Sequence, residues 1–479
     1  MGVNFLQTSL VDFNKEKTLR FDVKFHNVFT KIIKTERTAP FLDFYKVGRK
    51  ECNVEELDQI KYVEIGSVSN EDNINAFDLS DDKSIDLAER ERLLKKIENG
   101  DIFKPEEESI LIASVRPNLK KYISISNLES DLYFTKAFIY LKPKQDLISS
   151  KLLKYVLRTI LFNRLIGLCR EGKGYPTLKE NDLKFFFIEN SLIGKIKKYK
   201  KQIEEKIDEN DQKIYQLKQK IEPLQNIIDD IFVKYGVKSN KFTDKQEEYF
   251  LLTSKKIGNN LFLRLGAQYY SFFEVHQGLL FDESIQYNQI PLKQIVKKHK
   301  TIVLKKGVLD QPYILLDLEQ LEAKTGRILD EPDKVEEIGS DKVVFGDSDI
   351  IISKIDPYLA YVFINDKNKN YIGTTELVPF KLVNENTNIY YLKYCLLSNE
   401  YITKSALIMY GKRHPRLHIK DLLSIKIPLS DIEIQKKIVS EIQQREEKSN
   451  QYKEEIKKLR EEIDNLIYKT LKQGEYGFY

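Results

Sequence analysis

The chain has 479 residues, more than a single hydrophobic core usually holds, and this length predicts two or three domains. Its 78 Lys and Arg against 73 Asp and Glu leave a formal net charge of only +5, which excludes a uniformly cationic nucleic-acid-binding surface and restricts any DNA contact to local basic patches. Three cysteines without CxxC spacing argue against a zinc ribbon or a disulfide framework, and no apolar run approaches the roughly 18 residues of a membrane span, so we expect a protein of the reducing cytoplasm.

The first predicted domain covers residues 1–190 and mixes short strands with helical segments. Strands are expected at 62–65, 110–113 and 137–141, which are rich in β-branched and aromatic residues and lie between Gly and Pro residues. Residues 151–170 have the apolar spacing of a helix, which stops at the glycine-rich stretch 172–176.

A long amphipathic helix, the first spacer helix, is predicted over residues 191–236. Ile and Leu recur there in alternating steps of three and four, which is typical of a coiled-coil seam. Polar seam residues such as Asn210 commonly fix the register of a coiled coil. Pro223 has no N–H donor, so we expect it to kink the helix or to end it early. The predicted seam residues of this helix are Ile203, Ile207, Asn210, Ile214, Leu217 and Ile221.

The rest of the chain repeats this plan. Residues 237–260 are polar and aperiodic, which predicts a linker to a second domain at 261–428. The pattern GKxxPxLxxxDL occurs at 172–183 and again 239 residues later at 411–422, and the Leu-Lys-Tyr triplets at 153 and 392 have the same offset. One offset at both places indicates an internal duplication.

A second spacer helix is predicted over residues 429–473. Each spacer helix would be about 60 Å long at 1.5 Å per residue, too long to bury its apolar stripe against its own small domain. We therefore expect an α+β protein with two tandem repeated domains, each followed by a long helix, and with the two helices paired. The predicted seam residues of the second helix are Ile442, Ser449, Tyr452, Ile456, Leu459 and Ile463.

The sequence carries no recognisable catalytic set. No phosphate-binding GxxxxGK[ST] loop is present. The segment 356–358, Asp-Pro-Tyr, resembles part of the (D/N/S)PP(Y/F) box of amino-methyltransferases but lacks its second proline, and we interpret it and its counterpart at 116–118 as turns that end strands. His414 and His418 are separated by Pro415, which argues against a metal-binding helical face. We predict no catalytic residue and no metal site.

The most specific pattern lies near the end of the second domain. The motif GxxxPxLxxxDL at 411–422 leads into Ile-Lys-Ile-Pro-Leu at 425–429 and Glu-Ile-Gln-Lys-Lys-Ile-Val at 433–439. Together with two domains that each precede a long helix, it resembles the specificity subunit of type I restriction-modification enzymes, over nearly the whole chain. The first copy departs from the motif, with Phe-Phe-Phe-Ile-Glu-Asn at 185–190 and Gly-Lys-Ile-Lys-Lys at 194–198.

The resemblance implies a non-catalytic DNA reader. In that family two target-recognition domains each read one half of a split, asymmetric site in double-stranded DNA, and antiparallel helices act as a ruler between them. Two methyltransferase subunits bring S-adenosylmethionine and adenine-N6 methylation, and motor-nuclease subunits add ATP- and Mg-dependent cleavage. None of these cofactors is expected on this chain.

DNA contact is expected at the paired glycine- and proline-containing loops, where basic side chains can reach phosphates or base edges. A lysine run such as 293–306 is by itself usually a solvated surface, whereas the recurrence of the loops in both halves favours DNA. The alternatives are a specificity subunit of a related type II or solitary methylation system, and a coiled-coil scaffold without DNA affinity. The candidate DNA-contacting residues are Arg116, Lys120, Lys173, Tyr175, Lys354, Tyr358, Lys412, Arg413, His414 and Arg416.

Overall fold

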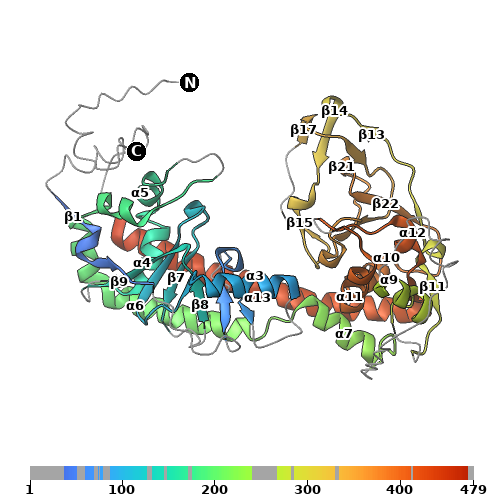
Figure 1. The fold of residues 1–479 in the computed structure, drawn as a ribbon, viewed down its shortest axis with the longest axis horizontal. Coiled ribbons are helices and arrows are strands. Elements are labelled where there is room, and N and C mark those ends of the chain that lie inside the picture. The colour runs from blue at the N-terminus through green and yellow to red at the C-terminus, as the bar shows by residue number, and fades with distance from the viewer. Residues whose placement is uncertain are drawn as a thin grey trace. The chain divides into compact units, whose positions relative to one another are not determined.

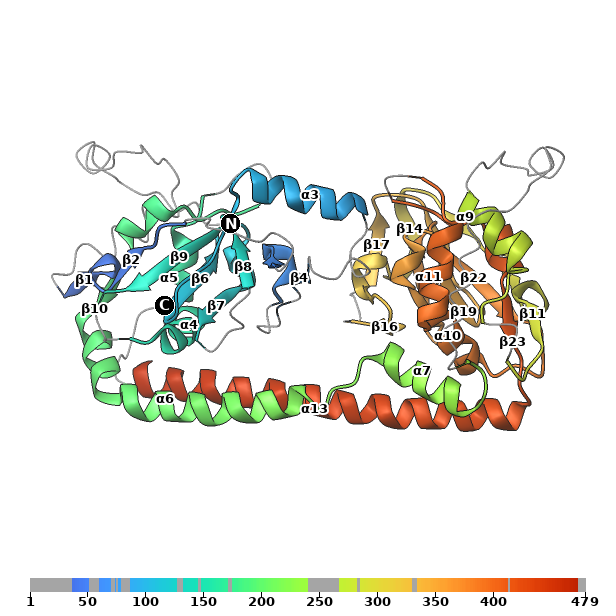
Figure 2. The ribbon, with the colours of Figure 1, turned by 60° about the horizontal axis from the view of Figure 1, so that its bottom comes forward.

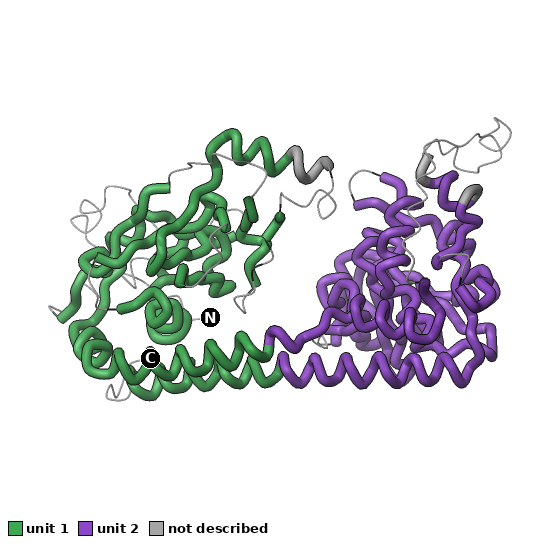
Figure 3. Tube along the Cα trace, turned by 90° about the horizontal axis from the view of Figure 1, so that it is seen from below, with its two compact units in different colours: residues 1–217, 454–479 green, residues 218–453 purple. Residues whose placement is uncertain are grey.

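A computed structural model shows two compact units, one formed by residues 1–217 and 454–479 and the other by residues 218–453 (Figure 3). The structure describes residues 37–50, 60–69, 74, 76–78, 87–126, 132–144, 148–170, 175–239, 267–281, 285–329, 334–411 and 414–472. Most of the predicted linker, residues 240–260, therefore lies outside the described residues. Within the described ranges, no helix combines the length and the apolar character needed to cross a bilayer.

The core of unit 1 is a four-stranded antiparallel sheet with two covered faces. Strand β6 is apolar from Ile110 to Ala113 because these side chains alternate between two hydrophobic clusters. Ile110 and Ile112 pack in the cluster that includes helix α4, and Leu111 and Ala113 pack in the other. The strand order is β2 (Tyr45–Val47), β9 (Phe138–Pro143), β6 (Ser109–Ala113) and β7 (Tyr122–Ile125). Figure 1 labels β9 and β7, and Figure 2 labels all four strands.

Unit 1 also contains a second sheet, a pair of strands and several helices. A second four-stranded sheet has the order β4 (Phe77–Asp78), β3 (Lys61–Val63), β8 (Leu132–Thr135) and β5 (Ile102–Phe103), and β1 (Thr38–Pro40) pairs with β10 (Phe187–Glu189). Helix α3 spans Leu87–Glu98. The predicted helix 151–170 is divided into α4 (Ser150–Arg158) and α5 (Phe162–Gly167). The hydroxyl of Ser149 caps α4 by accepting a hydrogen bond from Leu152 N–H at 3.2 Å.

Unit 2 contains the same central sheet, built from β12 (Val296–Lys298), β22 (Leu377–Leu382), β19 (Ile350–Ser353) and β20 (Val362–Ile364). The register is also the same, since Ile110 pairs with Leu141 in unit 1 and Ile350 pairs with Phe380 in unit 2. The pair β11 (Gln289–Pro291) and β23 (Lys426–Pro428) corresponds to β1 and β10. The α+β fold with two tandem, duplicated domains is thus confirmed.

The second sheet of unit 2 differs from that of unit 1. It has five strands, in the order β13 (Val303–Leu304), β18 (Lys342–Val344), β21 (Tyr371–Thr374), β14 (Gly307–Leu315) and β17 (Lys334–Ile338). A short hairpin joins β15 (Leu321–Glu322) to β16 (Arg327–Ile328). The helices of this unit include α9 (Ala267–Tyr270), α10 (Ile389–Leu397), α11 (Asn399–Ile408) and α12 (Ile419–Ser424).

In unit 1, helix α6 (Asn190–Lys218) packs antiparallel against the last part of α13 (Ile432–Lys472) (Figure 2). Lys195 Nζ donates to the carbonyl of Leu471 at 3.0 Å, and Asn210 Nδ2 donates to the carbonyl of Leu459, also at 3.0 Å. The predicted seam residues that are buried along these two segments are Ile203, Ile207, Asn210, Ile214, Leu217, Ile456, Leu459 and Ile463.

The predicted first spacer helix is not continuous, because α6 ends at Lys218 and α7 spans only Leu224–Lys234. A helix through Pro223 would bring the proline ring against the carbonyl four residues earlier, that of Gln219, so the helix stops before it. The prediction that Ile221 continues a helical seam is therefore wrong, because Ile221 lies in the break.

Two polar seam residues of α13, Ser449 and Arg445, contact the residues of this break within unit 2. Ser449 Oγ accepts a hydrogen bond from Glu222 N–H at 3.2 Å, which satisfies a donor exposed by the missing helical turn. Arg445 forms ion pairs with Glu222 and, at 3.1 Å, with Asp230 on α7. Ile442 is buried, whereas Tyr452 is half-buried with Lys220 Nζ 5.9 Å from the centre of its ring.

Candidate nucleic-acid interface

The interpretation of 116–118 and 356–358 as strand-ending turns holds in the structure, where each is part of a short 3-10 turn after a central strand. In unit 1 the turn Pro117–Leu119 is flanked by Arg116 and Lys120, with φ of 51° and 54°. In unit 2 the turn Pro357–Leu359 is flanked by Asp356 and Ala360, with φ of 46° and 43°. Left-handed backbone costs non-glycine residues about 1–3 kcal/mol each, so the neighbouring structure must hold both turns in place.

Backbone hydrogen bonds from a second loop hold the turn in unit 1. Arg116 N–H donates to the carbonyl of Pro176 at 2.9 Å, and Leu178 N–H donates to the carbonyl of Ser114 at 2.8 Å. We call this pair of segments, 114–120 with 175–178, the turn-loop frame of unit 1.

Unit 2 repeats the arrangement as its own turn-loop frame, formed by 354–360 with 414–417. Asp356 N–H donates to the carbonyl of Pro415 at 2.8 Å, and Leu417 N–H donates to the carbonyl of Lys354 at 2.7 Å. These bonds join backbone atoms only, so neither frame depends on particular side chains at these positions.

Arg116 and Tyr175 stack on the frame of unit 1. The guanidinium carbon of Arg116 lies 3.4 Å from the centre of the Tyr175 ring, a cation–π contact, and the ring is 54% exposed. Lys120 Nζ lies 4.4 Å from the centre of the Phe162 ring. This frame therefore presents two cations, each beside an aromatic ring, which suits contact with phosphates and with unstacked or edge-exposed bases.

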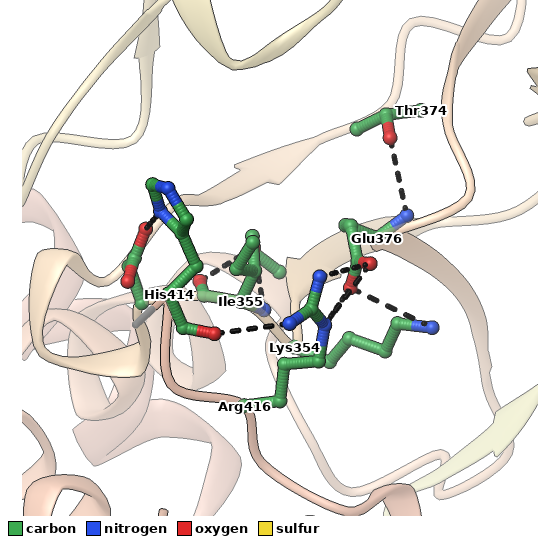
Figure 4. A network of polar contacts seen from close by, with 8 residues as sticks. Lys354, Ile355, Thr374, Glu376, His414 and Arg416 are labelled. Carbon is green, nitrogen blue, oxygen red and sulfur yellow. Dashed lines mark hydrogen bonds and ion pairs between the residues drawn. The ribbon is translucent and has the colours of Figure 1, made fainter. Parts of the chain in front are cut away.

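An ion-pair network occupies the frame of unit 2 (Figure 4). Arg416 Nη2 and Nε lie 3.0 and 3.1 Å from Glu376 Oε1, and Lys354 Nζ lies 3.6 Å from Glu376 Oε2. Arg416 Nη1 also donates to the carbonyl of His414 at 3.0 Å, and His414 Nδ1 lies 3.7 Å from a carboxylate oxygen of Asp356. The hydrogen bonds that Arg416 donates to Glu376 raise the pKa of the Arg416 guanidinium above its usual value.

The two frames carry different chemistry at matching backbone positions. The carbonyl of Ala137 accepts from Ser114 N–H in unit 1, and the carbonyl of Glu376 accepts from Lys354 N–H in unit 2, so these residues correspond. One backbone frame thus presents Arg116 stacked on Tyr175 among neutral residues in one unit, and a network of acidic and basic side chains in the other. The matched pairs, unit 1 first, are Ser114 and Lys354, Arg116 and Asp356, Ala137 and Glu376, Tyr175 and His414, and Thr177 and Arg416.

The structure places most of the predicted contact residues on these frames. Tyr358 is 37% exposed on the unit 2 turn, and burial together with the neighbouring Asp356 raises the pKa of its phenol. Lys173, Lys412 and Arg413 lie outside the described residues. The sequence reasoning missed Glu376, because a single acid at the end of a strand carries no pattern; its link to Arg416 needs a contact across 40 residues.

A cavity of about 270 Å³ lies behind the unit 1 turn. The turn residues Asn118, Leu119 and Lys120 form one wall, and Lys457, Arg460, Glu461 and Asp464 of α13 form another. Arg158 at the end of α4 also lines it and donates from Nη2 to the carbonyl of Lys120 at 3.2 Å. Arg158 therefore helps to fix the left-handed residue that carries the Lys120 side chain.

Residues 330–461 match a family described as the type I restriction modification DNA specificity domain. No curated protein sequence matches the chain.

Three solved structures are similar to the chain over most of its length. The HsdS subunit from Thermoanaerobacter tengcongensis is 11% identical, with 92% of this chain and 97% of that chain covered and a TM-score of 0.30. The type I restriction-modification S subunit from M. genitalium is 14% identical, with 91% and 95% covered and a TM-score of 0.41. A chain from a study of the assembly and conformational transition of the type I R-M system is 12% identical, with 91% and 98% covered and a TM-score of 0.35.

Proposed function

Since residues 330–461 carry a type I restriction modification DNA specificity domain, we propose that this chain is the sequence-reading subunit of a type I restriction-modification complex. Each unit reads one half of a split DNA site through its turn-loop frame. The chain itself performs no chemistry; methylation and cleavage belong to its partners.

The observation that best supports this proposal is that the two units carry different side chains on the same backbone frame. The two frames have the same strand register and the same backbone hydrogen bonds. One carries Arg116 and Tyr175 and the other carries Lys354 and Arg416, which suits two different half-sites. Such a site is asymmetric, because base identity is read by side chains in the groove and not by the backbone.

The long helices supply the second part of the proposal, a fixed spacing between the half-sites. Helix α13 is unbroken over 41 residues, and it contributes its first part to unit 2 and its last part to unit 1. Two half-sites bound together gain from a high effective concentration only when the spacing matches the DNA. A helical connection restricts that spacing more than a flexible linker does.

The proposal includes the partners. Two methyltransferase subunits that carry S-adenosylmethionine would dock on this chain and methylate adenine at N6 within the site. Motor-nuclease subunits that use ATP and Mg²⁺ would then cleave unmodified DNA.

The test is to express this chain together with a candidate methyltransferase subunit and to map modified adenines across the genome by long-read sequencing. We expect methylation within one split, asymmetric motif. The control is the same methyltransferase subunit without this chain, which should leave no such motif. A stable complex that methylates nothing would contradict sequence reading and would favour a scaffold. Methylation without restriction of foreign DNA would instead indicate a solitary methylation system.

A further inference from the structure

The Arg416 guanidinium is held in one orientation by two acceptors. Glu376 accepts from Nε and Nη2 along one edge, and the carbonyl of His414 accepts from Nη1. Two acceptors on two sides fix the plane of the guanidinium, so the side chain loses little rotamer freedom when it binds a ligand.

These contacts leave part of the guanidinium available. It has five N–H groups, and Glu376 and His414 take three of them in the described part of the chain. One N–H on Nη1 and one on Nη2 remain. The side chain is 38% exposed, so it is partly accessible to a ligand.

The ion pair has no role in building the frame. Unit 1 forms the same turn, the same loop and the same backbone hydrogen bonds with Thr177 in place of Arg416 and Ala137 in place of Glu376. Burying most of Glu376, whose side chain is 20% exposed, beside two cations is therefore a property of unit 2 and not a requirement of the fold.

A guanidinium with one remaining donor on each Nη atom and a fixed plane suits one base edge in the major groove. Guanine presents O6 and N7 as neighbouring acceptors there, whereas adenine and cytosine each place an amino donor in the corresponding region. A phosphate would also accept two such bonds, but phosphate is bound by lysine as well, as a point charge that needs no fixed plane.

We propose that Arg416 reads a guanine in the half-site bound by unit 2, donating from Nη1 and Nη2 to O6 and N7, and that Glu376 is the residue that positions it. This assignment rests on the function proposed above. Glu376 also repels phosphates that approach the same guanidinium, which favours the base edge over the DNA backbone.

The experiment uses the full chain purified with its methyltransferase subunits and a library of duplex DNA with a randomised segment. Bound molecules are sequenced for the wild type and for Arg416→Lys, Arg416→Ala and Glu376→Gln. The matched control is Arg327→Lys, because Arg327 forms the same kind of two-bond pair with Glu446, a residue of α13. The other half of the motif reports whether each variant is folded.

We expect a guanine in one half of the wild-type motif and a drop of about 5- to 150-fold in its discrimination for both Arg416 variants. Glu376→Gln should lower discrimination at that same position while raising affinity for DNA of any sequence. Arg327→Lys should leave the motif unchanged.

Three results would overturn the assignment. Arg416→Ala with undiminished guanine preference and a loss of affinity that is equal for all sequences would assign Arg416 to phosphate. A Glu376→Gln variant that loses a cytosine position would make Glu376 the reading residue. A wild type that selects no split motif would refute the proposed function itself, which is a different result from a split motif that the variants leave unchanged.

Discussion

Replacing Asn210 by leucine should stabilise the helix pair of unit 1. Asn210 is fully buried in the seam, and its Nδ2 donates to the carbonyl of Leu459. Its Oδ1 is buried without a hydrogen-bond partner among the described residues. An unsatisfied buried acceptor destabilises the folded state by about 1–3 kcal/mol, and leucine removes it. Leucine also adds buried apolar surface, which stabilises by about 1.5–3 kcal/mol.

Two costs oppose this gain. The hydrogen bond to Leu459 is lost, at about 0.5–1.5 kcal/mol, and the larger side chain must be fitted between Ile207 and Ile214, at about 1–3 kcal/mol. We expect a net stabilisation of about 1 kcal/mol. The carbonyl of Leu459 lies in the interior of α13 and keeps its helical partner, so the substitution leaves no backbone group unsatisfied.

The assay is amide hydrogen exchange of residues 203–217 in the full chain, since local opening of the helix pair limits that exchange. About 1 kcal/mol corresponds to exchange about fivefold slower in Asn210→Leu. The control Ile214→Asn adds a second buried amide to the same seam and should speed exchange. Faster exchange in Asn210→Leu would show that the Asn210 amide is fully satisfied and stabilising, and the reasoning from its buried oxygen would fail.

Three further predictions concern DNA and the helix break. Duplicating residues 210–216 in α6 together with residues 452–458 in α13 lengthens the helix pair by about 10 Å. The gap between the half-sites of the methylated motif should then grow by about three base pairs, with both half-sites unchanged. An unchanged gap would refute spacing by the helices. Replacing Lys412 and Arg413 by alanine should weaken DNA binding and reduce the salt slope of log affinity by up to about two, whereas an unaltered slope would remove that loop from the interface. Ser449→Ala removes the acceptor for the N–H group in the helix break and should destabilise unit 2 by about 1 kcal/mol, measured as a lower unfolding midpoint; no shift would mean that water replaces the hydroxyl.

The sequence predicts the fold better than it predicts the site. Apolar runs such as that of β6 and the constant offset of 239 residues depend on local or repeated patterns, and these survive in the structure. The end of α6 at Lys218 follows from the ring of Pro223, but the exact position of the break, and with it the status of Ile221, depends on contacts with α13.

The contacts within the site, unlike the fold, could not be predicted from the sequence. Arg416 and Lys354 could be selected as basic residues near a turn, but their shared partner Glu376 comes from another strand end, and no spacing in the sequence relates the three. The same holds for the contact between Arg158 and the carbonyl of Lys120. Tertiary pairings of single residues leave no periodic signal, so only the folded chain reveals them.

The division of α13 between the two units has a consequence for how the chain is synthesised. The core of unit 1 includes Ile463, Ile467 and Leu471, which follow the whole of unit 2 in the chain and leave the ribosome after it. The segment that contributes to unit 1 resumes at residue 454, which is 237 residues after residue 217 (454 − 217 = 237). At a translation rate of about 5–20 residues per second, Ile196, Ile203 and Ile207 wait about 10–50 s for their partners. Unit 2 is one uninterrupted segment and can fold first, so a nascent chain that stalls before residue 454 exposes an apolar helix face that chaperones and proteases recognise.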